Sequence, residues 1–427
     1  MTHSGRSTLS SRTVLAVGPG SRRRIAVGAV VAPFSQALGS FLLHMQVSQL
    51  LGNEGLAEFA VLFGVIVLGT ALVSGSIGDS LTVLDRNDPA VRAGLQFWLL
   101  VVSTTISVVA AGALWVSDFI GLRDVALFGL AGFVFMVQDS VRRMLMAVMR
   151  FWSIVIVDLT SMAFSVAFVV TVHVSRVEVT ISTFLIALVV GQLAGGLVAL
   201  LLLPPAERAW TRGWASGHRD GRKRVWQYGR WRGLQQAVRP LMMTLVRVIA
   251  IAGVGRAAFG ELEGARLFVA PAMLAVNGAC THLFASFARD RDATTPELLR
   301  RSDRGAALLV LASVGIGGGA VASLPWLSPL VVGDDFDLRR LDVVGWASYA
   351  AAVAATTPYG MLVAVRGAQK VALMVRSADA TASVIGVAVV MRVGWSATTI
   401  PYVLVVFALL GGLAIRHLAT QAPECLS

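Results

Sequence analysis

The residues in this sequence with the clearest capacity for chemistry are arginines inside a long apolar stretch. Arg232, Gln236, Arg239 and Arg247 fall on one helical face, within an arc of about 80° on a helical wheel. A guanidinium offers a planar fork of donors that suits phosphate oxygens. This face therefore predicts a binding site for an anionic substrate, with Arg239, Arg247 and Gln236 as contacts.

The energetic cost of these charges supports that interpretation and also supplies its alternative. A charged group inside a membrane-spanning helix costs about 2.5–3.5 kcal/mol on insertion scales and usually faces a cavity or a partner. Arg239 and Arg247 each lie only about 9–10 Å from an end of their stretch at the helical rise. Snorkelling toward opposite membrane surfaces is therefore the alternative to substrate binding.

A stripe of polar residues marks the first apolar stretch. Gln36, Ser40 and His44 recur at intervals of four residues and share one helical face, which would be unfavourable against lipid. Pro33, just before them, can kink the helix and free backbone carbonyls, as in helices that line cavities. We predict that the stripe contacts substrate, and His44 could also couple proton movement to transport. Hydrogen bonding to another helix is the alternative role for His44.

Two acidic residues also lie inside apolar stretches. Asp158 has no basic residue three or four positions away. It is predicted to bind a coupling cation or proton, and the alternatives are pairing with Arg376 or reaching the membrane surface. Asp139 has Arg142 and Arg143 one turn further on, which predicts a local ion pair.

The remaining reactive residues form no recognisable catalytic pattern. The six histidines are scattered, and Cys280 and Cys425 have no metal-ligand spacing. The sequence has no nucleophile elbow, P-loop, HExxH motif or paired-carboxylate loop. We therefore expect no enzymatic activity, no cofactor and no metal site.

The elements that position these residues are predicted to be membrane-spanning helices. Of 427 residues, 56% are apolar and 14% are charged, which is unlike an ordinary soluble domain. Apolar runs of 18 or more residues recur along the chain, and each can cross about 30 Å of hydrocarbon. The sequence predicts an all-α polytopic membrane protein with spans near residues 25–50, 56–80, 94–116, 125–146, 153–174, 181–203, 233–254, 264–288, 305–325, 343–365, 371–391 and 396–416.

The distribution of basic residues predicts the orientation of the chain. Of 36 Lys and Arg residues, 26 fall in the two ends and the alternate connections assigned to one side, and 6 fall in the connections of the other side. This asymmetry follows the positive-inside rule and predicts that both termini are cytoplasmic. The net charge of +12 is thereby explained without nucleic-acid binding.

A central connection divides the spans into two sets of six. It opens with Pro204-Pro205 and closes with a basic and aromatic run from Arg222 to Tyr228, which is typical of an interfacial segment that contacts anionic lipid. The predicted organisation is a cytoplasmic basic tail (1–24), a first lobe (25–203), a linker (204–232), a second lobe (233–416) and a cytoplasmic tail (417–427).

The two lobes also share a short sequence. Leu51-Gly52 follows the first span and Val254-Gly255 follows the seventh, at an offset of 203 residues, about half of the chain. Two six-span bundles related as parallel repeats place a substrate path between them near the bilayer midplane.

These segments resemble the polysaccharide flippases of the MOP superfamily, the multidrug/oligosaccharidyl-lipid/polysaccharide exporters. The resemblance covers about residues 25–416 and implies a MATE-like fold, with two six-helix bundles around a central cavity. The segments that carry it are Leu51-Gly52 with Phe59, Ser74 to Gly78, Tyr228-Gly229-Arg230-Trp231, Gly255 to Pro271, and Val331 to Phe336.

The resemblance implies a function in the export of cell-surface polysaccharide. A flippase of this family in the bacterial cytoplasmic membrane moves a polyprenyl-pyrophosphate-linked glycan from the inner to the outer leaflet by alternating access. Glycosyltransferases and a polymerase of the same pathway would be its partners, together with membrane lipids. The headgroup would occupy the polar cavity while the isoprenoid tail stays in lipid.

Three alternatives stay open. A multidrug exporter of the same superfamily shares the fold, but the basic face at 233–254 favours an anionic substrate. A major-facilitator carrier should have a Gly-x-x-x-Asp-Arg-x-Gly-Arg-like loop after its second span, and the run from Gly78 to Asp88 matches poorly. A glycan polymerase or ligase would need a sizeable external loop, and the longest predicted one, Trp326 to Asp342, has only 17 residues.

Overall fold

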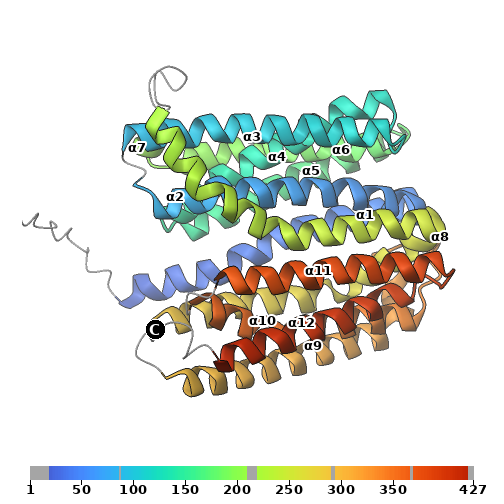
Figure 1. The fold of residues 1–427 in the computed structure, drawn as a ribbon. Helices are drawn as coiled ribbons and strands as arrows, with labels where there is room; N and C mark the ends of the chain where they lie inside the picture. The colour runs from blue at the N-terminus through green and yellow to red at the C-terminus, as the bar shows by residue number, and fades with distance from the viewer. Residues whose placement is uncertain (1–18, 86–87, 209–218, 290–293, 366–368, 422–427) are drawn as a thin grey trace, which may run out of the picture.

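The chain folds into a bundle of long helices that lie side by side (Figure 1). The computed structural model describes residues 19–85, 88–208, 219–289, 294–365 and 369–421, and within these ranges there is no strand. The elements are α1 (Pro19–Val73), the π-helix η1 (Ser74–Gly78), α2 (Asp79–Val83), α3 (Pro89–Val116), α4 (Leu122–Ala147), α5 (Phe151–Val174), α6 (Ile181–Leu202), α7 (Pro205–Arg208), α8 (Arg219–Arg289), α9 (Thr295–Val331), α10 (Arg340–Val365), α11 (Gln369–Arg392) and α12 (Thr399–Gln421).

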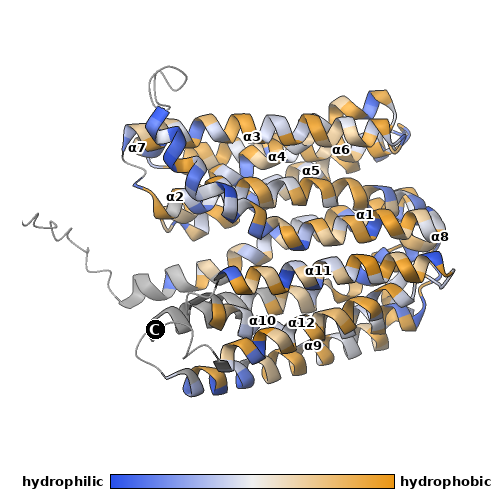
Figure 2. Ribbon diagram, viewed as in Figure 1, coloured by the Kyte–Doolittle hydropathy of each residue, from blue (hydrophilic) through white to orange (hydrophobic). Residues whose placement is uncertain are grey.

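The lengths and hydropathy of these helices make the chain a multi-pass membrane protein. Within the described ranges, nine helices are long and apolar enough to cross a membrane. Two of them, α1 and α8, are folded into hairpins that cross twice, and α10 packs between α9 and α12 as a further span. The described chain therefore has twelve spans, as predicted. Hydrophobic residues predominate along the middle of the helices, and hydrophilic residues are more frequent toward the two ends of the bundle (Figure 2).

Both hairpins turn at a glycine in a conformation that excludes other residues. Gly52 in α1 has φ 66° and ψ −163°, and Gly255 in α8 has φ 84° and ψ 169°. This region is essentially limited to glycine because a Cβ atom would clash with the backbone. The two glycines occupy matching places in the repeated sequence. The structure thus confirms the repeat and shows that it marks the same turn in each half.

Alanine at either turn should destabilise the protein. Gly52→Ala and Gly255→Ala are each expected to cost about 1–3 kcal/mol of unfolding free energy, because alanine must adopt the same strained backbone. Gly112, inside α3 with open space around its Cα, is the matched control, where alanine should be neutral or stabilising. Thermal unfolding in detergent measures all three, and an unchanged midpoint for both turn variants would contradict this explanation.

The two halves of the chain lie on opposite sides of the molecule. Helices α3 to α6 form one side and α9 to α12 form the other, while α1 and α8 run between them and contact each other extensively (Figure 1). At the end where both hairpins turn, the hairpin end, Arg256 Nη1 lies 3.2 Å from Glu58 Oε2. The described chain begins and ends at the opposite, terminal end, which the positive-inside rule predicts to be cytoplasmic.

The first turns of α8 pack against the N-terminal half of the chain at the terminal end. A Cβ atom on Gly233 would lie 2.9 Å from a backbone carbonyl oxygen of α1, so the two helices approach closely. Trp98 of α3 stacks on Trp226 with 4.5 Å between ring centroids. The predicted linker is therefore helical from Arg219, and its residues 209–218 lie outside the described ranges.

One predicted connection is shorter than expected. Helix α9 continues through Pro325 and Pro329 to Val331, and α10 begins at Arg340. Each proline removes only one backbone donor, and both lie in the last two turns, so the helix persists past them. The connection between these helices is thus 332–339 and not the predicted 17 residues.

Candidate functional site

A cavity of about 710 Å³ lies between the two halves of the chain. Side chains of α1, α4, α8 and α10 line it, so both repeats contribute to its wall. All six residues predicted to contact substrate line this one cavity: Gln36, Ser40, His44, Gln236, Arg239 and Arg247.

The part of the cavity nearer the hairpin end contains a buried ionic cluster. Arg247 Nε lies 3.1 Å from Glu263 Oε1, and Arg266 Nε lies 2.6 Å from Glu263 Oε2. Arg247 and Glu263 are both buried. Gly64 of α1 provides the space for this cluster, because a Cβ atom there would collide with the Arg247 guanidinium. Two cations thus share one carboxylate, and the cluster keeps a net positive charge beside the cavity.

His44 is fixed in one orientation near this cluster. Its Nδ1 lies 2.7 Å from the Ser40 carbonyl oxygen, and because a carbonyl only accepts, Nδ1 donates and carries the proton. The ring packs edge-on against Phe59 and Phe63, with centroid distances of 5.1 and 5.0 Å. Nε2 is then the acceptor nitrogen, and it has no hydrogen-bond partner in the described part of the chain.

Arg239 and Gln236 line the cavity closer to the terminal end. Arg239 is exposed to the cavity and forms no ion pair within 4 Å among the described residues, although Asp379 and Arg376 of α11 lie within electrostatic range. Gln236 Nε2 donates to Asp79 Oδ2 at 3.1 Å. Arg239 is therefore available to an anion, whereas Gln236 is already engaged.

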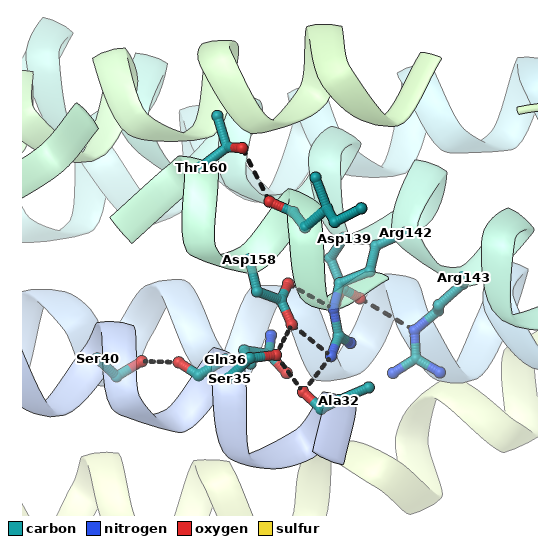
Figure 3. Close-up of polar contacts among 10 residues, drawn as sticks. Ala32, Ser35, Gln36, Ser40, Asp139, Arg142, Arg143, Asp158 and Thr160 are labelled. Carbon is teal, nitrogen blue, oxygen red and sulfur yellow. Dashed lines mark hydrogen bonds and ion pairs between the residues drawn. The ribbon is translucent and has the colours of Figure 1, made fainter. Parts of the chain in front are cut away.

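A second polar cluster lies in the N-terminal half (Figure 3). Arg142 of α4 contacts Asp158 of α5 through Nε and Oδ1 at 2.9 Å and through Nη2 and Oδ2 at 3.2 Å. Ser35 of α1 donates to the same Asp158 Oδ2 at 2.8 Å. Asp139 pairs with Arg143 at 3.0 Å, which confirms the predicted local ion pair. These contacts fasten α1, α4 and α5 together.

The contacts of Asp158 differ from those that the sequence suggested. Asp158 pairs with Arg142, so the suggested pair with Arg376 is wrong, and at 7% exposure its side chain is enclosed by protein. It lines a small side cavity of about 50 Å³, next to Gln36 and Ser40, and not the central one. Whether Asp158 or His44 couples an ion to transport remains a prediction.

The central cavity has an excess of positive charge. Three carboxylates, Asp139, Asp158 and Glu263, face five arginines that line it, so the described site keeps a net charge of +2. A cavity with one sign of charge and low-dielectric walls attracts ligands of the opposite sign. The five arginines are Arg142, Arg143, Arg239, Arg247 and Arg266.

Sequence reasoning missed Arg142, Arg143 and Arg266 as cavity residues. Arg266 lies three residues after Glu263 inside one predicted span, and this paired charge was the available signal. For Arg142 and Arg143 the sequence predicts a local ion pair with Asp139, and no spacing rule links Arg142 to Asp158 on the next helix.

Comparison with known proteins places the fold. No protein-family model and no curated protein sequence matches the chain. A solved MOP superfamily transporter from Pyrococcus furiosus, whose binding pocket is described as having reverse polarity, is 15% identical with a TM-score of 0.61, covering 95% of both chains. An inward-facing multidrug resistance MATE transporter is 16% identical with a TM-score of 0.63, covering 94% of this chain and 100% of that one.

A MATE transporter in a straight conformation is 15% identical with a TM-score of 0.65, covering 95% of this chain and 96% of that one. Coverage of this extent means that both halves of the chain are included in the likeness. The chain therefore has the fold of the MATE transporters of the MOP superfamily.

Proposed function

We propose that this protein is a lipid-linked oligosaccharide flippase, which moves a polyprenyl-pyrophosphate-linked glycan from the inner to the outer leaflet of the bacterial cytoplasmic membrane. The observation that carries the proposal is the cationic cavity between the two halves, with Arg239 open to it and Arg247 buried beside it. Guanidinium groups bind phosphate oxygens in bidentate geometry. The protein acts as a transporter and not as an enzyme.

The two arginines divide the path into two levels. Arg247 follows Arg239 by eight positions in α8, which is about 12 Å along a helix. A pyrophosphate that enters from the terminal end meets Arg239 first and the Arg247–Glu263–Arg266 cluster second. Alternating exposure of the cavity to the two sides, by rocking of the halves, then releases it at the hairpin end.

The membrane potential favours this direction of movement. With the terminal end in the cytoplasm, outward transfer of an anionic headgroup gains about 2.3 kcal/mol per charge per 100 mV. The protein has to lower the cost of carrying sugar and pyrophosphate through hydrocarbon, while the isoprenoid tail stays in lipid. Glycosyltransferases and the polymerase of the same pathway supply and consume the substrate on the two sides.

Multidrug export is the second candidate, because a structural neighbour is a multidrug resistance transporter. The reverse-polarity pocket described for the Pyrococcus furiosus protein indicates that this fold accommodates pockets of different charge. In this chain the excess of arginine around the cavity favours an anion over a cationic drug.

Depletion in cells tests the function directly. Lipid-linked oligosaccharide should accumulate in the inner leaflet, whereas unpolymerised units outside would indicate a polymerase. Normal glycan export with lost drug resistance would indicate a multidrug exporter.

In proteoliposomes, Arg239→Ala should slow flipping about tenfold or more, since a hydrogen bond to a charged group contributes about 1.5–3 kcal/mol. Arg392, exposed at the end of α11, is the matched control for replacement by alanine.

A further inference from the structure

Two buried polar atoms at the central cavity lack a hydrogen-bond partner. They are Nε2 of His44 and Oγ1 of Thr244, and the described chain offers neither of them a donor or an acceptor. Both residues line the cavity, and they are 4% and 7% exposed. A buried polar group that stays unpaired is destabilising, so such atoms indicate a partner that the protein itself does not supply.

The two atoms lie beside the cationic cluster. A Cβ atom on Gly64 would lie 3.3 Å from Thr244 Oγ1 and would also collide with the Arg247 guanidinium, so these two groups face the same point of α1. His44 interacts electrostatically with Arg247, Arg266 and Glu263. The unpaired atoms and the cations therefore belong to one region of the cavity.

The chemistry of the two atoms specifies the kind of partner. Nε2 of His44 can only accept, because Nδ1 holds the ring proton, so it requires an N–H or O–H donor. The Thr244 hydroxyl can donate or accept. A sugar attached to a phosphate that Arg247 binds would bring hydroxyl groups of this kind into the same region of the cavity.

We propose that His44 and Thr244 form a subsite for the hydroxyl groups of the sugar next to the pyrophosphate. This proposal rests on the proposed flippase function. It assigns recognition of the sugar to these two residues, whereas the arginines bind the phosphate. Arg247 supplies the charge-assisted contact to the anion, and the two neutral groups supply selectivity. A site built to hydrogen-bond a hydroxyl discriminates against a ligand that lacks it, because its own polar atoms then stay unpaired.

Binding of two lipids to the purified protein in nanodiscs tests this subsite. One is a polyprenyl-pyrophosphate-linked glycan and the other is the same polyprenyl pyrophosphate without sugar. Thr244→Val and His44→Phe should each weaken binding of the glycolipid about 2- to 10-fold, the value of one neutral hydrogen bond. Binding of the sugar-free lipid should not change, and Thr244→Ser should retain wild-type selectivity.

The remaining outcomes are distinguishable. Thr244→Val should fold normally, because valine has the shape of threonine and the hydroxyl has no partner to lose. Equal weakening of both lipids, or no weakening of either, would overturn the sugar subsite while leaving the flippase intact. Failure of the wild-type protein to bind either lipid would overturn the proposed function and the subsite with it.

Discussion

Arg247→Gln should abolish flipping of the lipid-linked glycan in proteoliposomes. The variant removes the buried guanidinium that faces the cavity, and with it the bidentate contact to a phosphate. It also leaves Glu263 with Arg266 alone. Because loss of one partner of a buried ion pair costs about 3–5 kcal/mol, the single variant alone does not separate lost binding from lost folding.

A double variant separates these two effects. Arg247→Gln together with Glu263→Gln removes one positive and one negative charge, so the cluster keeps its net charge. The unfolding midpoint should return part of the way to the wild-type value, because only Arg266, which is partly exposed, then lacks its carboxylate partner. Flipping should stay absent, because the phosphate contact is still missing. If the double variant flips the glycan normally, Arg247 has a structural role only, and the anion site has to be assigned elsewhere.

The architecture was predictable because its signals are local in the sequence. Apolar length determines a span, and an apolar residue followed by glycine precedes the second span of each half, as Leu51-Gly52 and Val254-Gly255. The glycine marks a turn that only glycine can make, so Gly52 and Gly255 could be matched across the repeat. The π-helix η1 was not predictable. It lies inside a predicted span, where Gly75 packs against the α8 backbone, and that contact depends on how distant segments meet.

The cavity was predictable only in part, for a related reason. A polar face on a single helix is visible as periodicity, and the stripes from Gln36 to His44 and from Gln236 to Arg247 line one space. The partners of these residues come from other helices. Glu263 meets Arg247 after the turn at Gly255, and no spacing rule along one helix predicts this contact.

Asp158→Asn is expected to be among the most destabilising single changes in the N-terminal half. Asp158 is buried and accepts from Arg142 through both oxygens and from Ser35, so neutralising it leaves the buried Arg142 guanidinium without its ion-pair partner. The expected loss is about 3–5 kcal/mol of unfolding free energy. Thermal unfolding in detergent measures it, with Glu297→Gln, in an exposed pair on α9, as the control that should change little.

Replacement of the Arg142–Asp158 pair tests whether Asp158 couples an ion to transport. In this conformation the guanidinium of Arg142 forms an ion pair with the Asp158 carboxylate. A cation can therefore bind Asp158 only in a conformation in which this ion pair is broken. Replacing both residues, with Arg142→Met and Asp158→Leu, should recover most of the stability because no unpaired charge remains. If Asp158 is the coupling site, this double variant should still flip substrate down its gradient but no longer respond to an imposed proton or sodium gradient. An unchanged response would assign the pair to the joining of α1, α4 and α5 and leave the coupling to another group.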